Sequence, residues 1–190
     1  MELTYKNIEN WYKGKAYKFR VRPNEINLLG IRANYVATNA WDDTLVITYI
    51  NDNNEEKVVI FKNFTTDPGY YFLKTKLLNP KGCAFLKEGN YKNMFTVGLH
   101  LGKYKALKQY SNITVYRDAD KDDNLEFGNE ESGYFGINLH HGFNSAVIFN
   151  NSAGCQVLKS PKDLDVVVAL AEKHEALYGA GIDYTLTSNI

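Results

Sequence analysis

The sequence contains little cysteine, and it has no excess of charge of either sign. Two cysteines, Cys83 and Cys155, are too few for a disulfide framework, so we expect two free thiols, with Cys83 a small buried hydrophobic residue. The 22 basic residues balance the 22 acidic ones and are scattered, which argues against nucleic acid as a partner. No apolar run approaches the roughly 20 residues that cross a bilayer, so membrane insertion is not expected.

The N-terminal residues also lack the basic and then apolar pattern of a secretory signal, and we expect no signal peptide. Proline is scarce, at 4 residues, whereas 14 Tyr and 10 Phe accompany many short runs of Val, Ile and Thr. This composition favours β structure over a helical bundle. A chain of 190 residues is most simply one domain, and its core is large enough to be stable without a metal or a disulfide.

Short runs of β-forming residues separated by turn signals predict a mainly β (α+β) fold. The clearest signal is a hairpin of residues 45–50 and 57–61 around an Asn-rich turn. Further strands are predicted at residues 70–73, 82–86, 95–100, 104–109, 113–116 and 134–139. Many short strands at close spacing favour a sandwich or a barrel over a doubly wound sheet.

Two helices are predicted, one near each end of the chain. Residues 2–11 have helical apolar spacing that ends before Gly14, and residues 1–43 are expected to form an N-terminal helix and arm packed on a core of residues 44–190. The main helix should begin after Ser160 as N-cap, with Pro161 at its first position, and stop at Gly179. It should pack on the sheet.

The segment that carries chemistry is a glycine turn that ends in Cys155. A cysteine is a useful nucleophile as the thiolate, and an imidazolium or a cluster of backbone amides can lower its pKa. Gly154 would let the backbone approach a substrate carbonyl, the amides around Gly154 and Cys155 could stabilise an oxyanion, and Ser152 could hold the turn. The alternative is a buried structural thiol on a strand that continues through Gln156.

Two histidines precede this turn. Strand alternation places His140 with Asn138 on one face, and His141 on the other face with the apolar residues, so His140 is the better base and His141 the alternative. The side chain of Asn138, or a carbonyl near His141 or Gly142, could orient the imidazole.

The two remaining histidines are expected to have no part in the reaction. His100 ends another strand and is expected to be a hydrogen-bonded structural residue. His174 is expected to be exposed on the main helix.

These motifs resemble the L,D-transpeptidase catalytic domain family, whose signature is a strand ending in His-Gly followed closely by Ser-x-Gly-Cys. The resemblance extends over about residues 44–188 and includes the opening hairpin, the turn at residues 66–69, the helix after Cys155 and a final strand at residues 184–187. It implies a β-sandwich with one main helix after the cysteine motif. The layout is more similar to a divergent branch found in phages and in Bacteroidetes-type bacteria.

The resemblance implies an enzyme that acts on the stem peptides of peptidoglycan through an acyl-enzyme on Cys155, with no required cofactor. Many members have a His where this chain has Ala153 and an Arg where it has Val157. The missing Arg and the missing export signal favour hydrolysis by a phage lysin, L,D-carboxypeptidase or endopeptidase over L,D-transpeptidation. Such a protein would reside in the bacterial cytoplasm before lysis or in the virion, among other virion proteins.

Two alternatives stay open. A catalytically inactive phage structural or cell-wall-binding protein could keep the fold, and a cysteine peptidase acting on protein would use the same thiolate. A low thiol pKa would favour either enzyme over the inactive protein.

An acidic segment is the one candidate metal site. Its alternating oxygen-bearing residues, Asp118, Asp120, Asp122, Asn124 and Glu126, resemble an EF-hand calcium loop. The pattern departs at Asp123, where Gly is usual, and at Asn129, which takes the place of the closing Glu. Weak calcium binding is therefore one interpretation, and a solvated acidic turn is the other.

Overall fold

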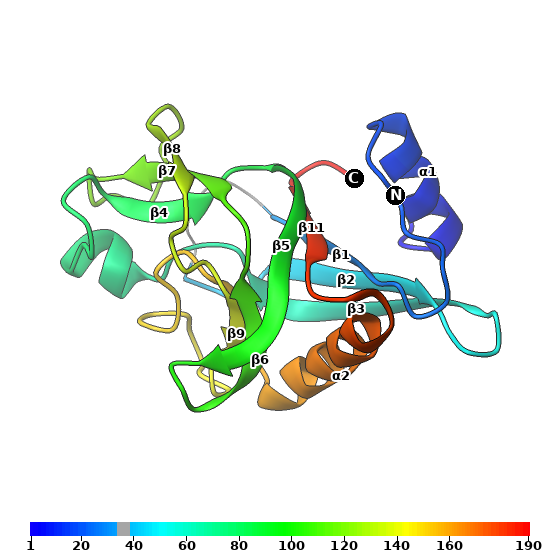
Figure 1. Ribbon diagram of the computed structural model, residues 1–190. Helices are drawn as coiled ribbons and strands as arrows, with labels where there is room; N and C mark the ends of the chain where they lie inside the picture. The colour runs from blue at the N-terminus through cyan, green and yellow to red at the C-terminus, as the bar shows by residue number, and fades with distance from the viewer. Residues whose placement is uncertain (34–38) are drawn as a thin grey trace.

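The computed structural model describes residues 1–33 and 39–190. It is mainly β, as predicted, with a closed eight-stranded barrel in the order β1-β11-β5-β6-β9-β10-β3-β2 and a separate sheet in the order β4-β7-β8 (Figure 1). The barrel strands are β1 (Asn27–Ile31), β2 (Asp43–Ile50), β3 (Glu56–Thr65), β5 (Gly89–His100), β6 (Tyr104–Gln109), β9 (Leu139–His141), β10 (Gln156–Leu158) and β11 (Ile182–Thr187). The expected sandwich is corrected to a barrel-like sheet, because β1 pairs with both β2 and β11 and closes the ring.

The small sheet consists of β4 (Cys83–Leu86), β7 (Ile113–Asp118) and β8 (Glu130–Gly133). In the view of Figure 1 it lies to the left of the barrel, whereas the N-terminal helix lies to the right. Most strand predictions are confirmed, including the hairpin of β2 and β3.

Two strand predictions are wrong. The aromatic run at residues 70–73 lies in a π-helical turn, η1 (Tyr71–Thr75), whose Leu73 packs against Cys83, Phe85 and Leu125. The predicted strand at residues 134–139 forms only at its end, where β9 begins.

The two predicted helices are confirmed with small shifts. Helix α1 (Tyr5–Gly14) begins after Thr4, whose hydroxyl accepts a hydrogen bond from the Asn7 amide at 3.2 Å. Helix α2 (Pro161–Tyr178) starts at the predicted proline and stops before Gly179, although the Ser160 side chain makes no capping hydrogen bond to the part of the chain that the structure describes. Leu164, Val167, Val168 and Ala171 of α2 join the core of the barrel.

The N-terminal region does not form an arm outside a core that starts at residue 44. Helix α1 does pack on the outside, where Ile8 and Tyr12 meet Leu29 and Val46. Strand β1, however, is a barrel strand, so the predicted boundary cuts through the barrel.

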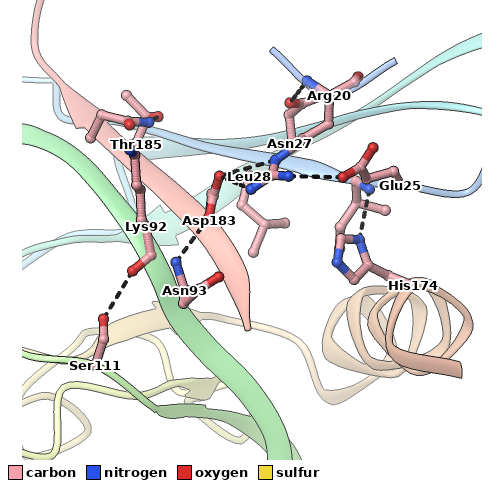
Figure 2. Close-up of polar contacts among 12 residues, drawn as sticks. Arg20, Glu25, Asn27, Leu28, Lys92, Asn93, Ser111, His174, Asp183 and Thr185 are labelled. Atoms are coloured by element: carbon pink, nitrogen blue, oxygen red, sulfur yellow. Dashed lines mark hydrogen bonds and ion pairs between the residues drawn. The ribbon is translucent and has the colours of Figure 1, made fainter. Parts of the chain in front are cut away.

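Charged side chains fasten this N-terminal region to the end of the chain. Arg20 donates to Asp183 from Nε at 3.1 Å and from Nη2 at 2.6 Å, and its Nη1 bonds Glu25 at 3.0 Å (Figure 2). Asp183 also accepts the Asn93 amide at 2.8 Å. The segment before β1 is thereby linked to β11 and β5.

His174 is not exposed, contrary to the prediction. The residue is 5 % exposed, and its Nδ1 accepts the backbone N–H of Ile26 at 3.0 Å. Figure 2 shows the His174 ring pointing from α2 toward the segment that carries Glu25. Burial lowers the pKa of His174. The residue is a structural link between α2 and the N-terminal region.

Candidate functional site

The cysteine and histidine segments meet as neighbouring parallel strands. Strand β9 pairs with β10 with Leu139 opposite Gln156 and His140 opposite Val157. Cys155 therefore lies beside Asn138. Because aligned residues in a parallel pair point to the same face and alternate residues share a face, Cys155, Asn138 and His140 lie on one face.

Backbone groups of the preceding segment hold the sulfur. The N–H of Asn138 donates to Sγ of Cys155 at 3.5 Å, and the thiol points to the carbonyl oxygen of Gly136 at 3.6 Å. Gly136 has φ of 77°. The sulfur thus accepts a hydrogen bond from one main-chain group and donates one to another.

The turn before the cysteine is closed by Ser152, as the sequence suggested. Its hydroxyl accepts the Gly154 amide at 3.1 Å and donates to the carbonyl of Cys155 at 3.0 Å. Gly154 has φ of 110°, and a Cβ there would lie 2.0 Å from the carbonyl oxygen of Ala84. The turn is therefore pressed against β4, and the Gly154 amide is already engaged.

His140 belongs to a pair of stacked imidazoles. Its ring lies 4.2 Å from that of His100 at an interplanar angle of 20°. Its Nδ1 contacts the carbonyl oxygen of His141 at 3.0 Å, and since a carbonyl only accepts, this nitrogen carries the proton. The lone pair of the neutral ring is then on Nε2, the arrangement that a general base needs.

The sequence predicts a structural His100 with no part in the reaction, yet the structure places this residue in the same cluster. Asn138 donates from Nδ2 to Nδ1 of His100 at 3.3 Å, so one side chain links His100 to the strand beside Cys155. The strand pairing that brings it there, β5 with β6 and β6 with β9, joins segments that no local pattern relates.

The second histidine of the motif has different neighbours. His141 stacks on Tyr104 at 4.2 Å, and its Nδ1 accepts the Phe143 amide at 3.3 Å. Gly142 faces Trp41, since a Cβ there would lie 2.4 Å from the indole ring. His141 and Gly142 therefore belong to an aromatic corner at the end of β9.

Gln156 does not face a substrate. It is 0 % exposed, and its Oε1 accepts the hydroxyl of Tyr184 at 2.6 Å inside the barrel. Alternation along β10 turns it away from the face that carries Cys155. The expected orienting or substrate-binding role is corrected to a core hydrogen bond.

The electrostatics keep both reactive groups uncharged at neutral pH. Burial raises the pKa of the Cys155 thiol to about 11, against the opposing effect of the Asn138 amide. Burial, followed by the neighbouring His100, lowers the pKa of His140 to about 4. Burial also lowers the pKa of His100. The resting pair is a thiol and a neutral imidazole, not a thiolate and an imidazolium.

A cavity of about 380 Å³ opens beside Cys155. Its walls include Ala153 from the cysteine turn, Phe135 and Gly136 before β9, Cys83 from β4 and Arg117 from β7. Arg117 is tied to Glu131 at 2.8 Å and to the carbonyl of Gly82 at 3.3 Å. The cavity therefore lies between the barrel and the small sheet and has a guanidinium in its wall.

The acidic segment follows β7. Carboxylate oxygens of Asp118, Asp120 and Glu126 lie within 4.8 Å of one another. Asp122 is outside this group and accepts the Asn124 amide at 2.6 Å and the Asn124 side chain at 3.0 Å. Burial raises the pKa of Asp118 to about 6. Of the predicted set, the structure thus brings together Asp118, Asp120 and Glu126 and leaves Asp122 outside the group.

No protein-family model matches this chain, and no curated protein or solved structure is significantly similar to it. Within residues 1–33 and 39–190, neither helix has the length and apolar character needed to cross a membrane.

Proposed function

We propose that the protein is a cysteine-dependent enzyme that acts on the stem peptides of peptidoglycan through an acyl-enzyme on Cys155. The observation that carries this proposal is the placement of Cys155 and His140 on the same face of two neighbouring strands, with Cys155 in the wall of a cavity. The L,D-transpeptidase resemblance of the sequence supplies the substrate class. The same resemblance suggests a phage or bacterial setting.

In the proposed reaction, the sulfur of Cys155 attacks a peptide carbonyl while Nε2 of His140 takes the thiol proton. The tetrahedral intermediate collapses to a thioester, and the amine leaves with the proton from His140. Because the Gly154 amide bonds Ser152, the backbone N–H of Cys155 is the better candidate for the oxyanion. Water or a second stem amine then resolves the thioester.

The roles of the neighbouring groups follow from their contacts. His141 O accepts from Nδ1 of His140 and fixes the tautomer, while His100 supports the ring by stacking. Arg117 lies in the cavity wall, and a carboxylate of the stem peptide would share its guanidinium with Glu131. We favour hydrolysis over transfer.

A second function is favoured by the electrostatics. Moving the thiol proton to the imidazole without substrate would cost on the order of 10 kcal/mol, given the separation of the two pKa values. An enzyme must offset this cost in the transition state, when the C–S bond forms with the proton transfer. A binding protein has no such requirement, so a catalytically inactive phage structural or cell-wall-binding protein is the alternative.

The deciding experiment incubates the full chain with purified peptidoglycan fragments and follows the products and the intact protein by mass spectrometry. With wild type we expect new fragments and an adduct of one acyl group on the protein. With Cys155→Ala we expect neither the fragments nor the adduct. Cys83→Ser, which alters the other thiol of the cavity, should keep the activity. Equal product formation by Cys155→Ala would end the mechanism, and a fragment that binds without turnover would favour the second function.

A further inference from the structure

The acidic group at the end of β7 has a feature that an ordinary solvated acidic turn lacks. Asp118 is 0 % exposed, and its two carboxylate oxygens have different surroundings. Oδ2 accepts the backbone N–H of Glu126 at 3.1 Å, whereas Oδ1 is buried and has no hydrogen-bond partner among the described residues. A buried carboxylate oxygen without a partner is costly, because water no longer solvates it.

The exposed members of the group complete a cup of carboxylates. Asp120 and Glu126 are exposed, and each places an oxygen within 4.8 Å of the others and of Asp118. Calcium binds oxygens at roughly 2.3–2.6 Å, so oxygens that share one ion lie within about 5 Å of one another. The observed spacing is therefore that of ligands around a common centre.

We propose that Asp118, Asp120 and Glu126 form a calcium-binding site. The site leaves room for water ligands, because Asp120 and Glu126 are on the surface. Calcium accepts six to eight oxygens in a flexible geometry, whereas magnesium requires a tight octahedron, so an open loop site with three carboxylates suits calcium better. Of the residues in the calcium-loop pattern of the sequence, Asp118, Asp120 and Glu126 would therefore bind the ion. Asp122 instead forms a hydrogen bond with Asn124.

Calcium at this site would join the end of β7 to Glu126 in the loop that leads to β8. Asp118 is the last residue of β7 and pairs with Cys83 of β4, and Arg117 next to it lines the cavity beside Cys155. The ion would therefore stiffen the edge of the small sheet that forms one cavity wall. The proposal does not depend on the reaction proposed for Cys155.

The test is a calcium titration of the full chain after treatment with a chelator, by isothermal calorimetry and by thermal unfolding. We expect one calcium ion per chain with a Kd of about 0.1–1 mM, as in open extracellular sites, and much weaker binding of magnesium. At a large excess of calcium the Tm should rise by about 5 °C or more. No calcium-dependent heat or Tm shift at about 10 mM would overturn the proposal.

Matched variants assign the ligands. Asp120→Asn and Asp118→Asn should each weaken calcium binding at least about tenfold. Asp123→Asn removes the same charge from the same loop, but Asp123 pairs with Lys74 outside the group, so its Kd should stay within about threefold of wild type. Because Asp120 is exposed, Asp120→Asn decides the matter if Asp118→Asn does not fold. An equal loss in Asp123→Asn would show general charge attraction and would also overturn the proposal.

Discussion

The imidazole ring of His140 stacks on that of His100, with centroids 4.2 Å apart and planes inclined by 20°. Two rings at this distance cannot both carry a positive charge without repulsion, and His140 is also almost fully buried, at 6 % exposure. The stack therefore stabilises the uncharged ring. A neutral imidazole with its lone pair on Nε2 is available as a proton acceptor but holds a proton poorly.

The first prediction concerns the titration of His140. Its pKa should lie near 4, because burial and His100 both disfavour the imidazolium. His100→Phe keeps a ring for stacking but removes the neighbouring charge, and should raise the pKa of His140. NMR titration of the imidazole C–H signals measures both values. His174 provides an internal control whose signal should be unaffected, and a wild-type pKa near 6.5 would contradict the description of the site.

The second prediction concerns stability in acid. The folded pKa of His140 is below that of an ordinary histidine, so the unfolded chain binds a proton first. The contribution of His140 to stability is complete above pH 6.5 and is lost as the pH falls towards 4, up to about 3 kcal/mol. Denaturant unfolding of wild type and His140→Phe from pH 7.5 to 4 should show wild type losing stability faster. Parallel curves would refute the assignment.

The third prediction concerns the reactivity of Cys155. Its thiol pKa of about 11 means that alkylation, measured with Cys83→Ser so that one thiol reports, should be slow at pH 7.5 and should increase beyond pH 9. Adding His140→Phe should change the rate little. A plateau below pH 8 that disappears with His140→Phe would instead show a preformed thiolate–imidazolium pair.

The fourth prediction concerns the glycine turn. Gly154→Ala should lower the free energy of unfolding by about 3 kcal/mol or more, because the new methyl group would meet the carbonyl oxygen of Ala84. Gly128→Ala is the matched control, since Gly128 also has positive φ, 136°, but no atom of the described residues lies within 4 Å of a Cβ there. Chemical denaturation of both variants separates the clash from the backbone strain, and equal losses would argue against close contact with β4.

The fifth prediction concerns a buried charge cluster. Arg32 has a fully buried side chain, and its Nε lies 3.4 Å from Oδ1 of Asp67, while Asp43 accepts the amide and hydroxyl of Thr66 nearby. Burial and then Asp43 raise the pKa of Asp67 to about 8.

This folded pKa is above the ordinary value of a carboxyl group, so stability from Asp67 is lost as the pH rises towards 8. Asp67→Asn should therefore gain stability relative to wild type between pH 5 and 9 in urea unfolding. A constant difference would mean that Asp67 is already ionised at pH 5.

Local patterns were sufficient for the elements whose signals lie within a few residues. The β2–β3 hairpin follows from alternation around an Asn-rich turn, and α2 follows from Pro161 and Gly179 at its ends. The prediction of a strand at residues 70–73 is wrong because β propensity reflects packing on a sheet, and here Leu73 packs into a small cluster as part of η1.

The local sequence pattern determined a mainly β fold and its main helix. It also determined that the Cys155 thiol lies in a glycine turn and that strand alternation puts His140 on the face of Asn138. Tertiary structure alone decided that β1 closes a barrel, that His100 stacks on His140, and that Gln156 bonds Tyr184 in the core. It also decided the protonation of Cys155 and His140. Burial and neighbouring charge set a pKa, and both come from residues far away in sequence, which no local spacing encodes.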